Sequence, residues 1–323
     1  MNSQERVEAA ILLTTHESQL SIMPLVMIES QQQKKAYLYA LVAVLFWSTI
    51  ASAFKISLRY VPVLPLVLHA SVVSTGVLFA TLLWQQKLAL LKALSRRDYV
   101  RSALLGFLNP FVYYLIMIKA YSILRAQEAM TINWSWPMTL VLLSIPLLHQ
   151  RIKARSILAI AISFLGVLII ATRGDLRGFK FTNPVGVFLA LVSTVIWTLF
   201  WIYNTRDKRD EAVRLFLNFA FGSAYAFTAF LFMLPFVETK IPNGKGILGA
   251  VYVGLFEMGI TFLVWLKALR LAKTTAHVAN LIYLAPFLSL VLISVLVGEE
   301  IDLSTVAGLV LIVAGIILQK LWG

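Results

Sequence analysis

The sequence is a succession of apolar runs of about 20 residues, separated by short links that hold most of the charged side chains. A transmembrane helix needs about 20 mostly apolar residues. Of the 323 residues, 60% are hydrophobic and 13% are charged, whereas an average soluble domain has roughly 25% charged residues. A soluble protein of this composition would expose large apolar patches and aggregate. The composition therefore predicts an all-α membrane protein.

Ten of the runs are long enough, or nearly long enough, to cross a bilayer as helices. They cover residues 37–58, 64–85, 102–122, 126–148, 156–171, 184–204, 214–236, 246–269, 275–297 and 303–321. Charged residues, glycine or proline bound each run, and these residues favour helix ends. We therefore predict ten transmembrane helices.

The distribution of Lys and Arg orients the predicted helices. If the N-terminus is cytoplasmic, the cytoplasmic side holds 19 of the 28 Lys and Arg residues, and the other side holds the remaining nine. Lys and Arg are in excess on the cytoplasmic side of membrane proteins, so both termini are expected there. The net charge of +13 then reflects topology and contact with lipid headgroups, and no nucleic-acid partner is expected.

Residues 1–33 contain two short apolar runs, and neither is long enough to span a membrane. No basic segment precedes a long apolar core, so a cleaved signal peptide is not expected. We expect a disordered tail, or an upstream extension of a chain that begins at Met27.

The two halves of the sequence resemble each other at an offset of about 148 to 150 residues. The segment from Ala40 to Trp47 matches the segment from Ala190 to Trp197, and the segment Gly106–Asn109 matches Gly254–Glu257. Later in each half, Pro137 matches Pro286 and Gly166 matches Gly315. Five helices per repeat is an odd number, so the second repeat must enter the membrane inverted. We predict a first repeat at 34–173 and an inverted second repeat at 184–323, an arrangement typical of secondary transporters.

The closing segment of the chain contains residues 276–286, the run Leu296-Val-Gly-Glu-Glu300, and Gly308 and Gly315. This segment resembles the corresponding one of EamA-type proteins in the drug/metabolite transporter superfamily, and the resemblance extends over residues 36–323. Two stretches of the first half, residues 45–49 and 126–143, are similar to aromatic amino acid exporters of the YddG type. The resemblance implies ten helices in two inverted repeats, a small-molecule substrate, export by alternating access, and a multi-pass protein of the bacterial inner membrane.

Glu257 is the first candidate for a substrate-binding residue, because it lies about 11 residues from either end of its predicted helix. A carboxyl group at that depth is costly unless it is protonated, paired or facing a cavity. Thr261 and Trp265 follow at helical spacing on the same face. Asn109 takes the equivalent place in the first repeat, and we expect it to face Glu257. All of these residues could instead be packing groups between helices.

Further candidates are polar or aromatic residues within the predicted spans. Asn133 and Trp136 share a helix face, and Trp197 and Trp201 share another. Trp47, Tyr113 and Tyr283 complete the predicted substrate-binding set. Pro137 and Pro286 are predicted to kink their helices, which frees backbone carbonyl groups near a cavity. Core packing is the alternative interpretation for each of these residues.

The sequence holds no phosphate-binding loop, no zinc-protease motif and no cysteine. We therefore expect no cofactor, no metal and no enzymatic activity. The predicted function is secondary transport of small metabolites, with aromatic or other amino acids as candidates. The alternatives are a transporter of another polar metabolite or drug-like amphiphile, a membrane-embedded enzyme, or a channel; the sequence does not fix the oligomeric state.

Overall fold

A computed structural model describes residues 31–149, 154–175, 183–234, 243–272 and 280–322. These residues form helices and connecting turns, with no strand in the described part of the chain, which confirms the all-α prediction. Within these ranges, six helical segments are long and apolar enough to cross a membrane: Gln31–Ser57, Val63–Trp84, Arg96–Ile123, Pro184–Asn204, Glu211–Met233 and Gly244–Leu271. Shorter apolar helices cover Ile157–Ala171, Leu281–Val297 and Leu303–Leu318.

Packing divides the chain into two units, residues 1–44 with 264–282 and residues 45–263 with 283–323. In the described part of the smaller unit, the ammonium group of Lys267 lies 4.7 Å from the ring centre of Tyr39. The predicted tail at 1–33 falls almost entirely outside the described residues; its last three residues already belong to the first helix.

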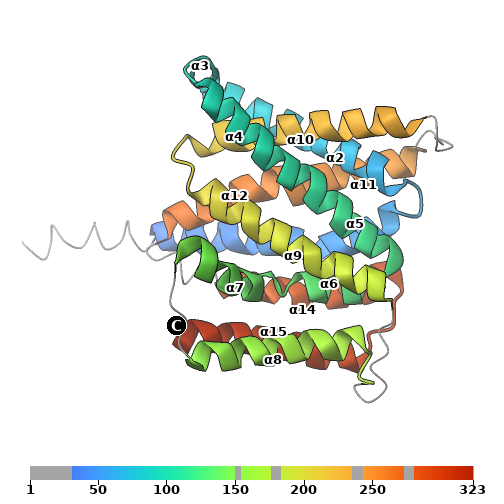
Figure 1. The fold of residues 1–323 in the computed structure, drawn as a ribbon. Helices are drawn as coiled ribbons and strands as arrows, with labels where there is room; N and C mark the ends of the chain where they lie inside the picture. The colour runs from blue at the N-terminus through green and yellow to red at the C-terminus, as the bar shows by residue number, and fades with distance from the viewer. Residues whose placement is uncertain (1–30, 150–153, 176–182, 235–242, 273–279, 323) are drawn as a thin grey trace, which may run out of the picture. The chain divides into compact units, whose positions relative to one another are not determined.

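The larger unit is a bundle of helices whose long members pack in pairs (Figure 1). α2 (Val63–Trp84) packs on α10 (Glu211–Met233), and α8 (Ala154–Ala171) packs along α15 (Leu303–Trp322). Close approach in the second pair requires glycine. A Cβ on Gly166 would lie 2.5 Å from the carbonyl oxygen of Gly308, and a Cβ on Gly308 would lie 2.6 Å from the carbonyl oxygen of Gly166.

The third and eighth membrane segments are not uniform α-helices. In the third, α4 (Arg96–Gly106) and α5 (Tyr113–Ile123) flank η1 (Phe107–Val112), where the extended backbone of Asn109 (φ −148°, ψ 121°) kinks the helix. In the eighth, α11 (Gly244–Val253) and α12 (Ile260–Leu271) flank the π-helical segment η3 (Gly254–Gly259). Both interruptions overlap the matched sequences of the repeat, and each contains one of the matched polar residues, Asn109 or Glu257. Short π segments in helices, such as η3, occur frequently at functional sites.

The predicted helix at 126–148 is two helices, α6 (Ala126–Asn133) and α7 (Trp136–Leu148). The interruption falls at Trp134 and Ser135, and Pro137 then lies in the first turn of α7. A proline in the first turn removes no hydrogen bond, because amide groups there have no partner within the helix. Pro286 lies in the first turn of α14 (Leu284–Leu292), after the 3₁₀ segment η4 (Asn280–Tyr283) and before the π-helical segment η5 (Ile293–Val297). The structure therefore places both prolines in the first turns of helices, and the kinks at Pro137 and Pro286 remain predictions.

The short connection between α9 (Pro184–Thr205) and α10 is held by ion pairs. Asp207 has a side chain only 1% exposed and binds the guanidinium groups of Arg209 at 2.5 Å and Arg101 at 3.5 Å. Asp210 caps α10 by accepting from the amides of Ala212 and Val213. It also pairs with Lys87 at 2.7 Å, next to the short helix α3 (Leu88–Lys92).

Candidate functional site

Glu257 is buried, with 7% of its surface exposed, in the π segment η3. The hydroxyl of Tyr114, on α5, donates a hydrogen bond of 3.1 Å to its Oε1 atom. Among the described residues, no Lys, Arg or His side chain forms an ion pair with this carboxyl group. An ionisable group with a neutral partner in a membrane segment is costly, and such groups mark substrate or ion pathways.

An aromatic cluster extends from the tyrosine pair on α5. The ring of Tyr113 lies 4.7 Å from that of Tyr114 and 4.7 Å from that of Trp197 on α9. Trp197 contacts Trp201 at 5.6 Å, and Phe262 contacts Trp201 at 5.8 Å and Trp47 at 6.2 Å. Centroid separations of 4.5–7 Å are those of interacting aromatic rings. Several predicted residues from separate membrane segments therefore meet in one place.

Asn133 ties the last turn of α6 to this cluster. Its Nδ2 atom donates to the Ser193 hydroxyl at 2.9 Å, and its Oδ1 atom accepts from the Tyr113 hydroxyl at 3.5 Å. Hydrogen bonds thus link Ser193 to Asn133 and Asn133 to Tyr113. A separate hydrogen bond links Tyr114 to Glu257, and the rings of the two tyrosines are in contact.

Among the remaining predicted residues, Thr261 and Trp136 form hydrogen bonds that involve backbone carbonyl groups. The Thr261 hydroxyl donates to the backbone carbonyl of Phe256 on its own helix, and Trp136 offers its carbonyl group to Thr198 at 3.4 Å. Tyr283 is half-buried at the start of α14. Trp265 is buried within the smaller unit.

Asn109 is fully buried in η1, and neither polar atom of its side chain has a hydrogen-bond partner among the described residues. The structure therefore forms no hydrogen bond between Asn109 and Glu257. Buried amide groups are almost always satisfied, so Asn109 has unused capacity for both donating and accepting.

Sequence reasoning missed two members of the cluster, Tyr114 and Phe262. The repeat offset of 148 residues, which aligns Asn109 with Glu257, also aligns these two residues with each other. Applying the offset to aromatic residues would have identified both.

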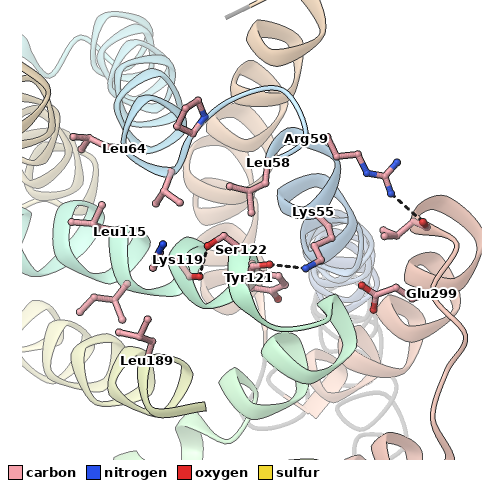
Figure 2. A pocket seen from close by; sticks show the side chains of 14 residues that line it. Lys55, Leu58, Arg59, Leu64, Leu115, Lys119, Tyr121, Ser122, Leu189 and Glu299 are labelled. Carbon is pink, nitrogen blue, oxygen red and sulfur yellow. Dashed lines mark hydrogen bonds between the residues drawn. The ribbon is translucent and has the colours of Figure 1, made fainter. Parts of the chain in front are cut away.

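A cleft of about 850 Å³ lies at the end of the molecule where α5 ends (Figure 2). Its walls come from the first helix and its link to α2, from α5, from α9, and from the residues that follow α14. Three cationic side chains, Lys55, Arg59 and Lys119, line it together with the carboxyl group of Glu299. Leu58, Leu64, Leu115, Leu189 and Tyr121 supply much of the apolar wall.

Glu299 and its neighbours connect the two halves of the sequence beside this cleft. The Glu299 carboxylate accepts from the amides of Ala126 and Gln127 at 2.9 and 3.3 Å, and so caps the first turn of α6. Arg125 pairs with Asp302 at 2.7 Å, and Arg173 pairs with Glu128 at 2.8 Å. Glu299 and Asp302 therefore bind residues of the first repeat.

The fold and the buried polar and aromatic site are those of a multi-pass membrane transporter. The EamA-like transporter family model matches residues 34–172 and again 184–319, so the chain belongs to that family. The match confirms the predicted membrane fold of ten helices in two inverted repeats.

Relatives and a solved structure agree with this assignment. A protein described as an uncharacterized transporter of Clostridium kluyveri is 25% identical over 88% of this chain and 93% of the relative. The aromatic amino acid exporter YddG of Ancylobacter novellus is 25% identical over 59% of this chain and 65% of the relative. A crystal structure with 23% identity superimposes with a TM-score of 0.61 over 89% of this chain and 97% of that one, which shows the shared fold. The names of the family and of both relatives are those of transporters and not of enzymes.

Proposed function

We propose that this protein exports small zwitterionic metabolites by alternating access, with aromatic amino acids as the first candidates. The observation that carries the proposal is a buried carboxyl group, Glu257, bonded to Tyr114 beside an aromatic cluster. A carboxylate without a cationic partner can take a substrate ammonium group. The tyrosine and tryptophan rings offer both stacking surfaces and a cation–π contact.

The named function of one relative supports the choice of substrate class, since the Ancylobacter novellus protein is an aromatic amino acid exporter. Asn109 and Asn133 add amide groups on neighbouring elements, which could orient the polar end of such a substrate. Inverted repeats with a polar site at their interface provide the structural basis for alternating access.

The proposal includes a topology. The excess of Lys and Arg supports cytoplasmic termini in a protein of the bacterial inner membrane. The proposed repeats cover 34–173 and 184–323 and follow a tail at 1–33. In this orientation the cleft and Glu299 lie at the non-cytoplasmic end, and the ion pairs of Asp207 lie at the cytoplasmic end.

Purified protein in liposomes tests the proposed activity. Vesicles loaded with unlabelled L-phenylalanine should accumulate radiolabelled L-phenylalanine by exchange, and an imposed pH gradient should show whether protons are coupled. Parallel assays with a neutral polar metabolite and a cationic drug-like amphiphile address the alternative substrates. Accumulation of one of these alternatives, with none of any amino acid, would reject the proposed substrate class.

A further inference from the structure

The cleft at the end of α5 holds more positive than negative charge. Three cations and one carboxylate line it, and that carboxylate already binds the amides of Ala126 and Gln127. Among the described residues, none of the three cations forms an ion pair with an acidic side chain within 4 Å.

The hydrogen-bond partners of Lys55 and Arg59 are neutral backbone carbonyl groups, so they do not neutralise the positive charges of these side chains. Lys55 donates to the backbone carbonyls of Tyr121, at 2.8 Å, and of Leu124, at the end of α5 (Figure 2). An ammonium group has three N–H donors, so one remains available. Arg59 uses one of its five donors on the carbonyl of Val297, at 3.1 Å. Lys119 is exposed, and no hydrogen bond of its ammonium group exists in the described part of the chain.

Helix α5 contributes residues to both the cleft and the buried site. Tyr121 lines the cleft, and Tyr114 lies seven positions earlier, about 10 Å along the helix and on the same face. A solute with an apolar side chain could rest against the leucines of the cleft while its anionic end meets the cations. We propose that this cleft is a binding site for the carboxylate group of the transported solute, held by Lys55, Arg59 and Lys119. The inference rests on the proposed function, because the cleft would bind the same solute as the site at Glu257.

The first test measures the electrostatic character of the cleft without any transport. The chain has no cysteine, so a Ser122→Cys variant places one reactive thiol at the wall of the cleft. The reagents are the negatively charged sulfonatoethyl and the positively charged trimethylammonioethyl methanethiosulfonates, each normalised to its rate with a free thiol. We expect the sulfonate reagent to react about tenfold faster, because a cleft lined by one sign of charge concentrates the opposite ion.

Removing the cations should abolish this preference. Arg59→Gln and Lys119→Gln, introduced together into the Ser122→Cys background, should bring the two rates close to equal. The matched control is Lys245→Gln, which removes a cation stacked on Tyr60 outside this cleft and should leave the preference intact. Equal rates in the starting variant, or a preference that survives loss of both cations, would overturn the proposal.

The second test identifies the anion by protection of the same thiol. L-phenylalanine and 3-phenylpropionate should slow labelling several-fold, whereas phenethylamine, which lacks the carboxylate, should not. The measurement is made in phosphatidylcholine nanodiscs and repeated with phosphatidylglycerol. Protection by the anionic lipid with none by either carboxylate would assign the site to a lipid headgroup and overturn the proposal.

The outcome is separable from that of the proposed function. If the liposomes exchange phenylalanine but neither carboxylate protects the thiol, the cleft site fails and the transport activity stands. If both carboxylates protect but no amino acid is exchanged, the site stands and the proposed substrate class fails.

Discussion

Glu257 and Asn109 occupy equivalent positions in the two repeats, but their surroundings differ. Glu257 accepts a hydrogen bond from Tyr114, whereas both polar atoms of Asn109 lack partners among the described residues. Leaving a buried polar group unsatisfied costs roughly 1–3 kcal/mol. The side-chain amide of Asn109 can therefore gain hydrogen bonds from a bound solute.

Replacing Glu257 by Gln tests whether the charge of this carboxyl group matters. The variant keeps the size of the side chain and its acceptor for Tyr114, so the protein should fold. We expect phenylalanine exchange in liposomes to fall at least tenfold, or to lose its dependence on pH. The control is Glu300→Gln, because the Glu300 side chain is exposed. Normal exchange by Glu257→Gln at every pH would make Glu257 a packing residue.

Replacing Tyr114 by Phe removes the one described donor to Glu257 and keeps the ring. If the hydroxyl positions the carboxyl group, exchange should fall about tenfold, since an unsatisfied buried acceptor costs roughly 1–3 kcal/mol. Tyr225→Phe serves as control, because the Tyr225 ring packs on Phe107 and no described hydrogen bond uses its hydroxyl. Equal exchange by the two variants would contradict a positioning role for Tyr114.

The sequence identified individual residues better than their partners. The depth of Glu257 and the spacing of Trp197 and Trp201 were readable because polar and aromatic residues stand out against aliphatic spans. Lys55, near the end of its predicted helix, binds carbonyl groups at the end of α5. Such contacts join positions that are 66 residues apart, and no local pattern encodes them.

At the scale of elements, the sequence located the membrane segments but not their interruptions. A change of helix type is normally read from a shift in the apolar period, and this signal is lost where nearly every position is apolar. The break at Trp134 and Ser135, the kink at Asn109 and the π segment around Glu257 therefore appear only in the structure. The interruptions at Asn109 and Glu257 lie on segments that the repeat offset aligns.

The contact between α8 and α15 depends on glycine, so Gly308→Ala should destabilise the protein. A Cβ at this position would lie 2.5 Å from Cγ1 of Ile170 and 2.6 Å from a backbone oxygen, and overpacking of this kind costs about 1–3 kcal/mol. Thermal unfolding in detergent should show a lower Tm. Gly76→Ala is the matched control, since nothing lies within 4 Å of its added Cβ. Equal Tm values for Gly308→Ala and Gly76→Ala would show that the contact between α8 and α15 accommodates an added methyl group without loss of stability.

The connection between α9 and α10 should lose stability in acid. Burial alone would raise the pKa of Asp207, but hydrogen bonds from Arg209 outweigh it and hold that pKa below its usual range. A group with a depressed pKa in the folded state stabilises the protein above its unfolded pKa of about 3.9, and this contribution is lost as pH falls further.

Asp207→Asn should therefore lower the Tm at pH 7, and its difference from the unsubstituted protein should shrink between about pH 4 and pH 3. Thermal unfolding across this range measures the difference. A difference independent of pH would mean that Asp207 acts through shape and neutral hydrogen bonds alone.

At the scale of the whole molecule, the fold class followed from the sequence because two constraints agree. Apolar length set the number of segments, and the offset between matching motifs set the repeat. An odd number of helices per repeat then required inversion. The cleft was not predictable in the same way, because its lining comes from the ends of several helices that only the folded chain brings together.

The proposed orientation can be tested with single cysteines in the cysteine-free chain. Lys119→Cys should react with a membrane-impermeant maleimide on intact cells, because the charge bias places Lys119 on the non-cytoplasmic side. Lys92→Cys should react only after permeabilisation. The reverse pattern of labelling would invert the topology and, with it, the side on which the cleft opens.

The ion pairs beside the cleft are only partly shielded from water, since the side chains of Arg125 and Asp302 are 28% and 29% exposed and that of Arg173 is 45% exposed. Dissolved salt screens such pairs over about 8 Å at physiological ionic strength and about 3 Å at 1 M. Arg125 and Arg173 both pair with Asp302, at 2.7 and 3.9 Å, and so join the first repeat to the second at the end proposed to face outward. If this end faces outward, as proposed, these ion pairs should weaken as the salt concentration outside the cell rises.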